Sequence, residues 1–252
     1  MTAQQERIVV DAHCHLGRTF QTEWKAKDLV RTMDACGIDR AVVFPTVNFE
    51  DNKFSNSNDM IAKAVSEYPD RLIGFARVNP HRGQEAVREL ERSKEKLGLV
   101  GIKLHPTTEI FPANSRIVHP IMKTATKLGM PVVFHSGTPP YSLPSQIADV
   151  AVRFSRIPVV MAHMGKALAT EAISSAKRSK NVILETSGSS SRIGLIEGAV
   201  RTLGAKRIIF GSDWPCCHPA PEKTKIEVLD LSKEAKEKIL GRNLLDMLSK
   251  YR

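Results

Sequence analysis

Eight short apolar runs, rich in β-branched residues, recur along this chain and alternate with segments of helical amphipathic pattern. Near-continuous apolar strands separated by helices are typical of a parallel sheet that is covered on both faces. Eight such units in 252 residues match a barrel of eight strands and eight helices, which commonly takes about 250 residues. The pattern therefore predicts an α/β fold of the (β/α)8 TIM-barrel type. The predicted strands are residues 8–15, 40–48, 72–79, 99–106, 131–137, 158–165, 182–188 and 207–215.

A doubly wound open sheet is the alternative architecture for the same alternation. The first strand-to-helix turn, HCHLGRTF, lacks the glycine-rich fingerprint with which such sheets bind phosphates. Residues 219–252 follow the eighth run and read as extra C-terminal helices that close the barrel. Because no linker or low-complexity stretch divides the chain, residues 1–252 are predicted to form a single domain.

The composition narrows the function classes. The net charge is +10, but Lys and Arg are interleaved with Glu in helical segments, and aromatic residues make up only 6% of the chain. This distribution argues against a nucleic-acid partner and leaves open the attraction of an anionic small molecule. Four cysteines without a C-x-x-C pair favour a reducing compartment. No signal-peptide core and no apolar run of roughly 20 residues is present, so we expect a cytoplasmic protein without a membrane partner. A homo-oligomer remains open.

His13 and His15 stand two positions apart near the end of the first predicted strand. A strand has a side-chain period of two, so both imidazoles should face the same side and Cys14 the other. Two polar rings in a buried strand need partners, and a metal ion suits neutral imidazole nitrogens. The His-x-His pair alone is weak evidence, since a buried or a surface pair explains it equally well.

Four further ligand-type residues end other predicted strands. His105, His135, His163 and Asp213 come at the ends of the fourth, fifth, sixth and eighth runs. The carboxyl ends of barrel strands meet at one face, where TIM-barrel active sites lie. Packing gives no reason to gather five imidazoles and a carboxylate there, so the sequence predicts a metal-centred site.

The ordered motifs DAHCH, GIKLHP, VVFHSG, VVMAHMG and FGSDWP resemble the amidohydrolase superfamily. The resemblance is to its amidohydrolase-related (amidohydrolase-2) branch, which includes the aminocarboxymuconate-semialdehyde decarboxylase-like enzymes, and it covers the whole chain. It implies one divalent metal ion held by His13, His15, His135 and Asp213, with His163 as a nearby acid–base or electrostatic residue. Zinc is the first expectation, with manganese, iron and nickel as alternatives.

The predicted metal site suggests hydrolysis by a metal-activated water molecule as the first mechanism to consider. A bound metal can bring the pKa of water to about 7, and Asp213 could accept its proton and pass it to a leaving group. His163 could polarise a substrate carbonyl or stabilise an oxyanion. The alternative for Asp213 is a helix cap.

Three more residues are candidates for substrate binding. Lys103 and His105 share one face of their strand, and Arg77 faces the lumen from the preceding strand. Lys103 could pair with a carboxylate such as Glu185, or could bridge two metals after carbamylation, as in other branches of the superfamily. Arg77 could clamp a substrate carboxylate or form an internal ion pair.

These features rank three functions. The first is a metal-dependent hydrolase of a small amide, lactone or ester that carries a carboxylate. The second is a metal-dependent non-oxidative decarboxylase of a small unsaturated or aromatic acid. The third, a barrel retained only for binding, is disfavoured because no expected site residue is missing.

Overall fold

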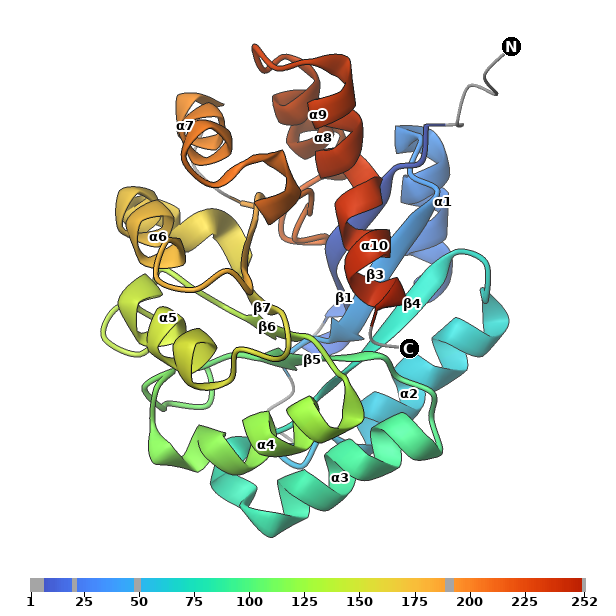
Figure 1. Ribbon diagram of the computed structural model, residues 1–252. Helices are drawn as coiled ribbons and strands as arrows, with labels where there is room; N and C mark the ends of the chain where they lie inside the picture. Colours follow the sequence, from blue (N-terminus) through green and yellow to red (C-terminus); the bar gives the residue numbers. More distant parts are fainter. Residues whose placement is uncertain (1–6, 20–21, 48–50, 189–192, 251–252) are drawn as a thin grey trace.

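The computed structural model describes residues 7–19, 22–47, 51–188 and 193–250. Within them, nine strands form one sheet in the order β2-β1-β3-β4-β5-β6-β7-β8-β9. Figure 1 shows the helices arranged around the strands. The strands are β1 (Val10–Thr19), β2 (Thr22–Trp24), β3 (Arg40–Pro45), β4 (Leu72–Arg77), β5 (Gly101–Leu104), β6 (Val132–Phe134), β7 (Val159–Met161), β8 (Val182–Glu185) and β9 (Ile208–Ile209).

The fold is TIM-barrel-like, but the sheet differs from the eight parallel strands that were predicted. Each of the eight predicted runs contributes a strand, and successive strands form seven parallel pairs, from β1 with β3 to β8 with β9. One additional strand, β2, was not predicted. It pairs antiparallel with the carboxyl end of β1 through Gly17–Thr19. Residue 48, the last of the second predicted run, lies outside the described residues.

The eighth predicted run, residues 207–215, forms only the two-residue strand β9. Its residues after β9 lie alongside β1 without regular secondary structure. Ala12 N donates to Phe210 O at 3.0 Å, His15 N donates to Trp214 O at 2.8 Å, and Asp213 N donates to His13 O at 2.8 Å. These bonds bring the first and last parts of the sheet together and place Asp213 beside the two histidines of β1.

The helices occupy the intervals where amphipathic segments were predicted. The described α-helices are α1 (Ala26–Cys36), α2 (Ser55–Glu67), α3 (Gln84–Glu95), α4 (His119–Leu128), α5 (Pro144–Arg153), α6 (Ala169–Ala176), α7 (Ile193–Leu203), α8 (Pro219–Glu227), α9 (Lys233–Glu237) and α10 (Asn243–Ser249). The last three are the extra C-terminal helices that were predicted. Residues 251–252 lie outside the described part of the chain.

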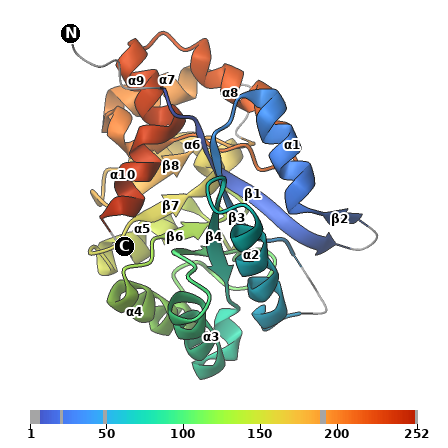
Figure 2. The same cartoon turned by 90° about the vertical axis from the view of Figure 1, so that its right-hand side faces the viewer.

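Two buried apolar clusters follow from the alternation along the strands. The outer cluster lies between strands and helices, and the inner one fills the barrel with residues such as Val42, Phe75 and Val160. Leu244 and Met247 of α10 join the inner cluster together with Val10, which begins β1. Helix α10 therefore closes the amino-terminal end of the barrel and leaves the carboxyl ends of the strands for the site. Figure 2 shows α10 on the left, on the side away from the arrowhead of β1 and from β2. Among the described helices, none combines the length and the apolar character needed to cross a membrane.

Candidate active site

Strand β1 carries both histidines on its inner face. The rings of His13 and His15 lie 5.2 Å apart between centroids, and both pack against the ring of Phe44 on β3. Cys14, between them, belongs to the outer apolar cluster. The period of two in the sequence therefore placed the imidazoles correctly.

Asp213 reaches the same two rings from the segment after β9. Its Oδ1 lies 3.2 Å from Nε2 of His13 and 3.2 Å from Nε2 of His15. The backbone at Asp213 has φ 66°, a left-handed conformation that turns the side chain into the site. Helix α8 is capped by His218 instead, so Asp213 is not its cap.

A second pair of imidazoles lies beside the first. His163 Nε2 is 3.1 Å from His135 Nδ1, and His163 Nδ1 is 3.2 Å from the carbonyl oxygen of Ser187. A carbonyl only accepts, so Nδ1 of His163 carries the proton and its Nε2 accepts one from His135. The outer nitrogen of His135, Nε2, is then an acceptor as well.

The metal-ligand set implied by the family resemblance is gathered only in part. Ligand atoms of His13, His163 and Asp213 lie within 4.8 Å of one another. His15 contacts Asp213, with its Nε2 3.2 Å from Oδ1 of Asp213. His135 contacts His163, with its Nδ1 3.1 Å from Nε2 of His163. The five residues are thus connected by contacts, with His163 closer to His13 and Asp213 than the sequence predicted and His135 farther out.

The donor chemistry of this cluster fits a cation. Glu185 Oε2 lies 2.8 Å from His13 Nδ1, and both side chains are fully buried. A carboxylate accepts this proton, so Nε2 of His13 is left with a lone pair that faces Asp213 Oδ1. His13 Nε2 and Asp213 Oδ1 are both acceptors and lie 3.2 Å apart, so a cation bound between them would be favourable. In addition, Nδ1 of His15 is buried and has no hydrogen-bond partner among the described residues.

The ionisation of these groups supports metal binding. Burial lowers the pKa of the His13, His135 and His163 rings, and neighbouring positive charge adds to this, with His163 falling to about 3. Neutral rings keep the lone pairs that a metal needs. Burial alone would raise the pKa of Asp213, but His13 and His15 outweigh it and hold that pKa below its usual value. Asp213 is therefore a carboxylate.

Lys103 enters the lumen as its position in the strand predicted, but its partner differs. Its Nζ lies 3.1 Å from His13 Nε2, and the expected pairing with Glu185 does not form, because Glu185 bonds to the opposite nitrogen of the same ring. Burial lowers the pKa of Lys103 to about 7, against the attraction of nearby carboxylates. The carbamylated bridge between two metals remains an untested prediction.

Arg77 forms an internal ion pair, one of its two predicted alternatives. Its Nη2 lies 2.5 Å from Glu109 Oε1, its Nη1 donates to the carbonyl of Pro45 at 3.2 Å, and the side chain is fully buried. Its guanidinium is thus already engaged. His105 stacks on His135 with ring centroids 4.0 Å apart and accepts from Thr108 at Nδ1, so it forms a wall of the site.

Three residues of the site were missed as candidates by the sequence analysis. Glu109 lies in the connection after β5, Ser187 follows β8, and Lys166 follows β7 with its Nζ 3.3 Å from His135 Nε2. Burial lowers the pKa of Lys166, although the Asp213 carboxylate counteracts this. Lys166 and Ser187 each stand three positions or fewer beyond a polar strand end, which is the signal that could have found them.

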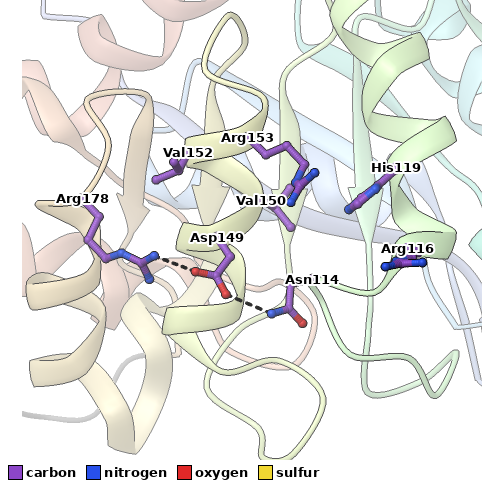
Figure 3. Close-up of a pocket in the computed structure, with 8 residues that line it drawn as sticks. All are labelled: Asn114, Arg116, His119, Asp149, Val150, Val152, Arg153 and Arg178. Atoms are coloured by element: carbon purple, nitrogen blue, oxygen red, sulfur yellow. Dashed lines mark hydrogen bonds and ion pairs between the residues drawn. The ribbon is translucent and has the colours of Figure 1, made fainter.

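A separate pocket of about 510 Å³ lies on the outer surface, between α4 and α5 (Figure 3). Asp149 is held there by Arg178 at 2.7 Å and by Asn114 at 3.0 Å. None of its lining residues belongs to the histidine cluster, so this pocket is distinct from the candidate site. It is lined by Asn114, Arg116, His119, Asp149, Val150, Val152, Arg153 and Arg178.

A TIM-barrel-like sheet whose strand ends carry converging histidines and an aspartate defines a class of metal-dependent barrel enzymes. This chain belongs to the amidohydrolase family of that class, because the family model described as Amidohydrolase matches residues 10–248. The family resemblance found in the sequence is thereby confirmed.

Two curated relatives and a solved structure refine the comparison. Gamma-resorcylate decarboxylase of Polaromonas is 26% identical over 247 residues, covering 74% of this chain and 76% of the relative. The 2-amino-3-carboxymuconate-6-semialdehyde decarboxylase of Dictyostelium discoideum is 33% identical over 78 residues, covering 31% of this chain and 22% of the relative. A dihydroxybenzoic acid decarboxylase from Polaromonas, solved with manganese and 2-nitroresorcinol, has a TM-score of 0.75 at 19% identity and covers 98% of each chain.

These comparisons correct two expectations. Hydrolysis was ranked ahead of decarboxylation, and this order is wrong, because both curated relatives are decarboxylases. Zinc as the first choice of metal is not supported either, since the similar structure holds manganese. The chain is a metal-binding enzyme of the amidohydrolase superfamily with a site for a single divalent metal ion.

Proposed function

We propose that this protein is a metal-dependent, non-oxidative decarboxylase of a small aromatic acid. The observation that carries the proposal is the convergence of His13, His15 and Asp213 beside His163 at the carboxyl ends of the strands. The decarboxylases to which the chain is similar favour this reaction over the others that the superfamily performs.

We assign the metal to His13, His15, His135 and Asp213, with manganese as the first choice. When bound, the metal supplies a positive charge that draws the oxygens of the acid to this end of the barrel. Glu185 orients His13 through Nδ1, so that Nε2 points at Asp213.

The protein's own residues perform the proton transfer. In the proposed reaction, a proton is added to the ring carbon that carries the carboxylate, the carbon–carbon bond breaks, and carbon dioxide leaves. The ring keeps the electron pair of the broken bond, so atoms and charges balance without an oxidant. We assign Asp213 the role of taking up a proton from the acid or from water and delivering it to that carbon, because its carboxylate lies beside both histidines of β1. His163 stabilises the charge that develops beside it.

The test is turnover of a panel of hydroxybenzoic acids by manganese-loaded protein. We expect one mole of carbon dioxide and one mole of the corresponding phenol for each mole of acid consumed. Asp213→Asn is the matched control, since it keeps the shape of the side chain and removes its basic oxygen. If no acid of the panel releases carbon dioxide while the protein holds its metal, the proposed function is wrong.

A further inference from the structure

The segment after β7 turns two side chains toward one imidazole. Residues 163–166, within Ala162–Leu168, all have left-handed backbone angles, with φ of 59°, 45°, 78° and 50°. As a result, His163 contacts Nδ1 of His135 at 3.1 Å, while the ammonium of Lys166 contacts Nε2 of the same ring at 3.3 Å. Lys166 therefore stands on the outer side of the histidine cluster.

This turn is fixed by the neighbouring strand end. Gly165 N donates to Ser136 Oγ at 3.1 Å. Gly137 has φ +86°, and a Cβ placed on it would lie 2.2 Å from the carbonyl oxygen of Gly165. The two connections therefore touch backbone to backbone, and this contact fixes the backbone from which the Lys166 side chain extends.

The charge of Lys166 is attracted by the Asp213 carboxylate, which is not close enough to form an ion pair with it. Of the three cations near the site, Arg77 is buried against Glu109, and Lys103 is fully buried with its Nζ 3.1 Å from His13 Nε2. Lys166 is only half-buried, and within the described ranges it forms no ion pair with a carboxylate. A cation held beside the cluster, with an imidazole as its neighbour and part of its surface open, is suited to an anionic ligand.

We propose that Lys166 binds the carboxylate of the substrate and thereby selects acids over neutral compounds at this site. The inference deepens the proposed decarboxylase function and rests on it. Arg77, for which the sequence left open a substrate clamp or an internal ion pair, acts within the protein by holding Glu109. Lys166 is a binding residue here, while proton transfer stays with Asp213.

The experiment compares two ligands that differ by the carboxylate. The affinities of manganese-loaded protein for 2,6-dihydroxybenzoate and for resorcinol are measured by calorimetry in wild type, Lys166→Gln and Lys166→Arg. Both substitutions keep an unbranched side chain at a left-handed position, so they add no backbone strain that lysine lacks. Lys127→Gln, on the exposed side of α4, is the control for a change of net charge.

Removing a charge-assisted contact should weaken 2,6-dihydroxybenzoate binding about 10- to 100-fold in Lys166→Gln. Resorcinol affinity should stay unchanged, and Lys166→Arg should recover most of the loss. If turnover is observed, KM for the acid should rise more than kcat falls. Equal affinity of wild type and Lys166→Gln for the acid overturns the inference, and so does a parallel loss for both ligands. Because binding is measured directly, absence of turnover would count against the proposed function alone.

Discussion

Nδ1 of His13 and Oε2 of Glu185 lie 2.8 Å apart in the barrel interior, where neither side chain has solvent contact. Ser187 Oγ also donates to this carboxylate oxygen, at 2.8 Å. Glu185 thus fixes the tautomer of His13 and aims its Nε2 at Asp213.

Glu185→Gln should therefore weaken metal binding even though Glu185 is no ligand. Losing a partner that orients a metal-binding histidine typically lowers metal affinity about 10- to 100-fold. Titration of metal-free protein with manganese, followed by calorimetry, gives the affinity directly. Glu197→Gln, on α7 outside the cluster, should bind manganese like wild type. Unchanged affinity in Glu185→Gln would show that His13 is oriented without it.

A second prediction separates His135 from His163 as metal ligands. The two ring nitrogens of His163 are engaged by Ser187 and by His135, whereas the Nε2 of His135 faces Thr138 and Lys166, which can turn away. We expect His135→Asn to lose most of its manganese and His163→Asn to keep it while losing turnover. Metal content after dialysis, measured by elemental analysis, checks both. If His163→Asn loses the manganese and His135→Asn keeps it, His163 is the ligand. The ligand atoms of His163, His13 and Asp213, which lie within 4.8 Å of one another, are compatible with that outcome.

The sequence predicted which side chains face the barrel interior better than it predicted their hydrogen-bond partners. The alternation in β1 and β5 correctly turned His13, His15 and Lys103 into the barrel, because facing depends only on the period of a strand. The partner of Lys103 depends on which strand end lies across the lumen, and no local pattern encodes that distance. Glu185 was proposed for Lys103 and instead bonds to His13.

The other differences between the predicted and the observed structure lie in segments without regular secondary structure. The eighth run is apolar enough for a longer strand, but Gly211 packs so closely that a Cβ on it would lie 2.3 Å from Glu185 Oε1 and 2.9 Å from the Cβ of His13. This close approach, and the left-handed turn at Asp213, end β9 after two residues. Glu109 and Lys166 lie in connections between strands and helices, where side-chain periodicity carries no information.

Asp213→Asn should abolish most of the activity and leave the fold intact. The substitution keeps one acceptor oxygen for the histidines but removes the group that carries the proton. General acid–base catalysis contributes about 10²- to 10⁴-fold in rate, and we expect a loss at the upper end of this range. Carbon dioxide release measures turnover, and circular dichroism checks the fold. Near-normal turnover with a lower Tm would assign Asp213 a structural role only.

The last prediction concerns acid stability away from the site. Glu89 on α3 is buried and accepts hydrogen bonds from Arg92, Asn58 and Ser55. Burial raises its pKa, but these donors outweigh burial, so the pKa in the folded protein lies below the value of 4.5 for a free side chain. An acid with a lowered pKa stabilises the fold above its unfolded pKa, and this contribution is lost as the pH falls through the folded pKa. Between about pH 6 and about pH 3, the Tm of wild type should therefore fall more steeply than that of Glu89→Gln, which starts lower. Glu95→Gln, an exposed change at the end of the same helix, should keep the steep profile, and equal slopes in wild type and Glu89→Gln would contradict the assignment.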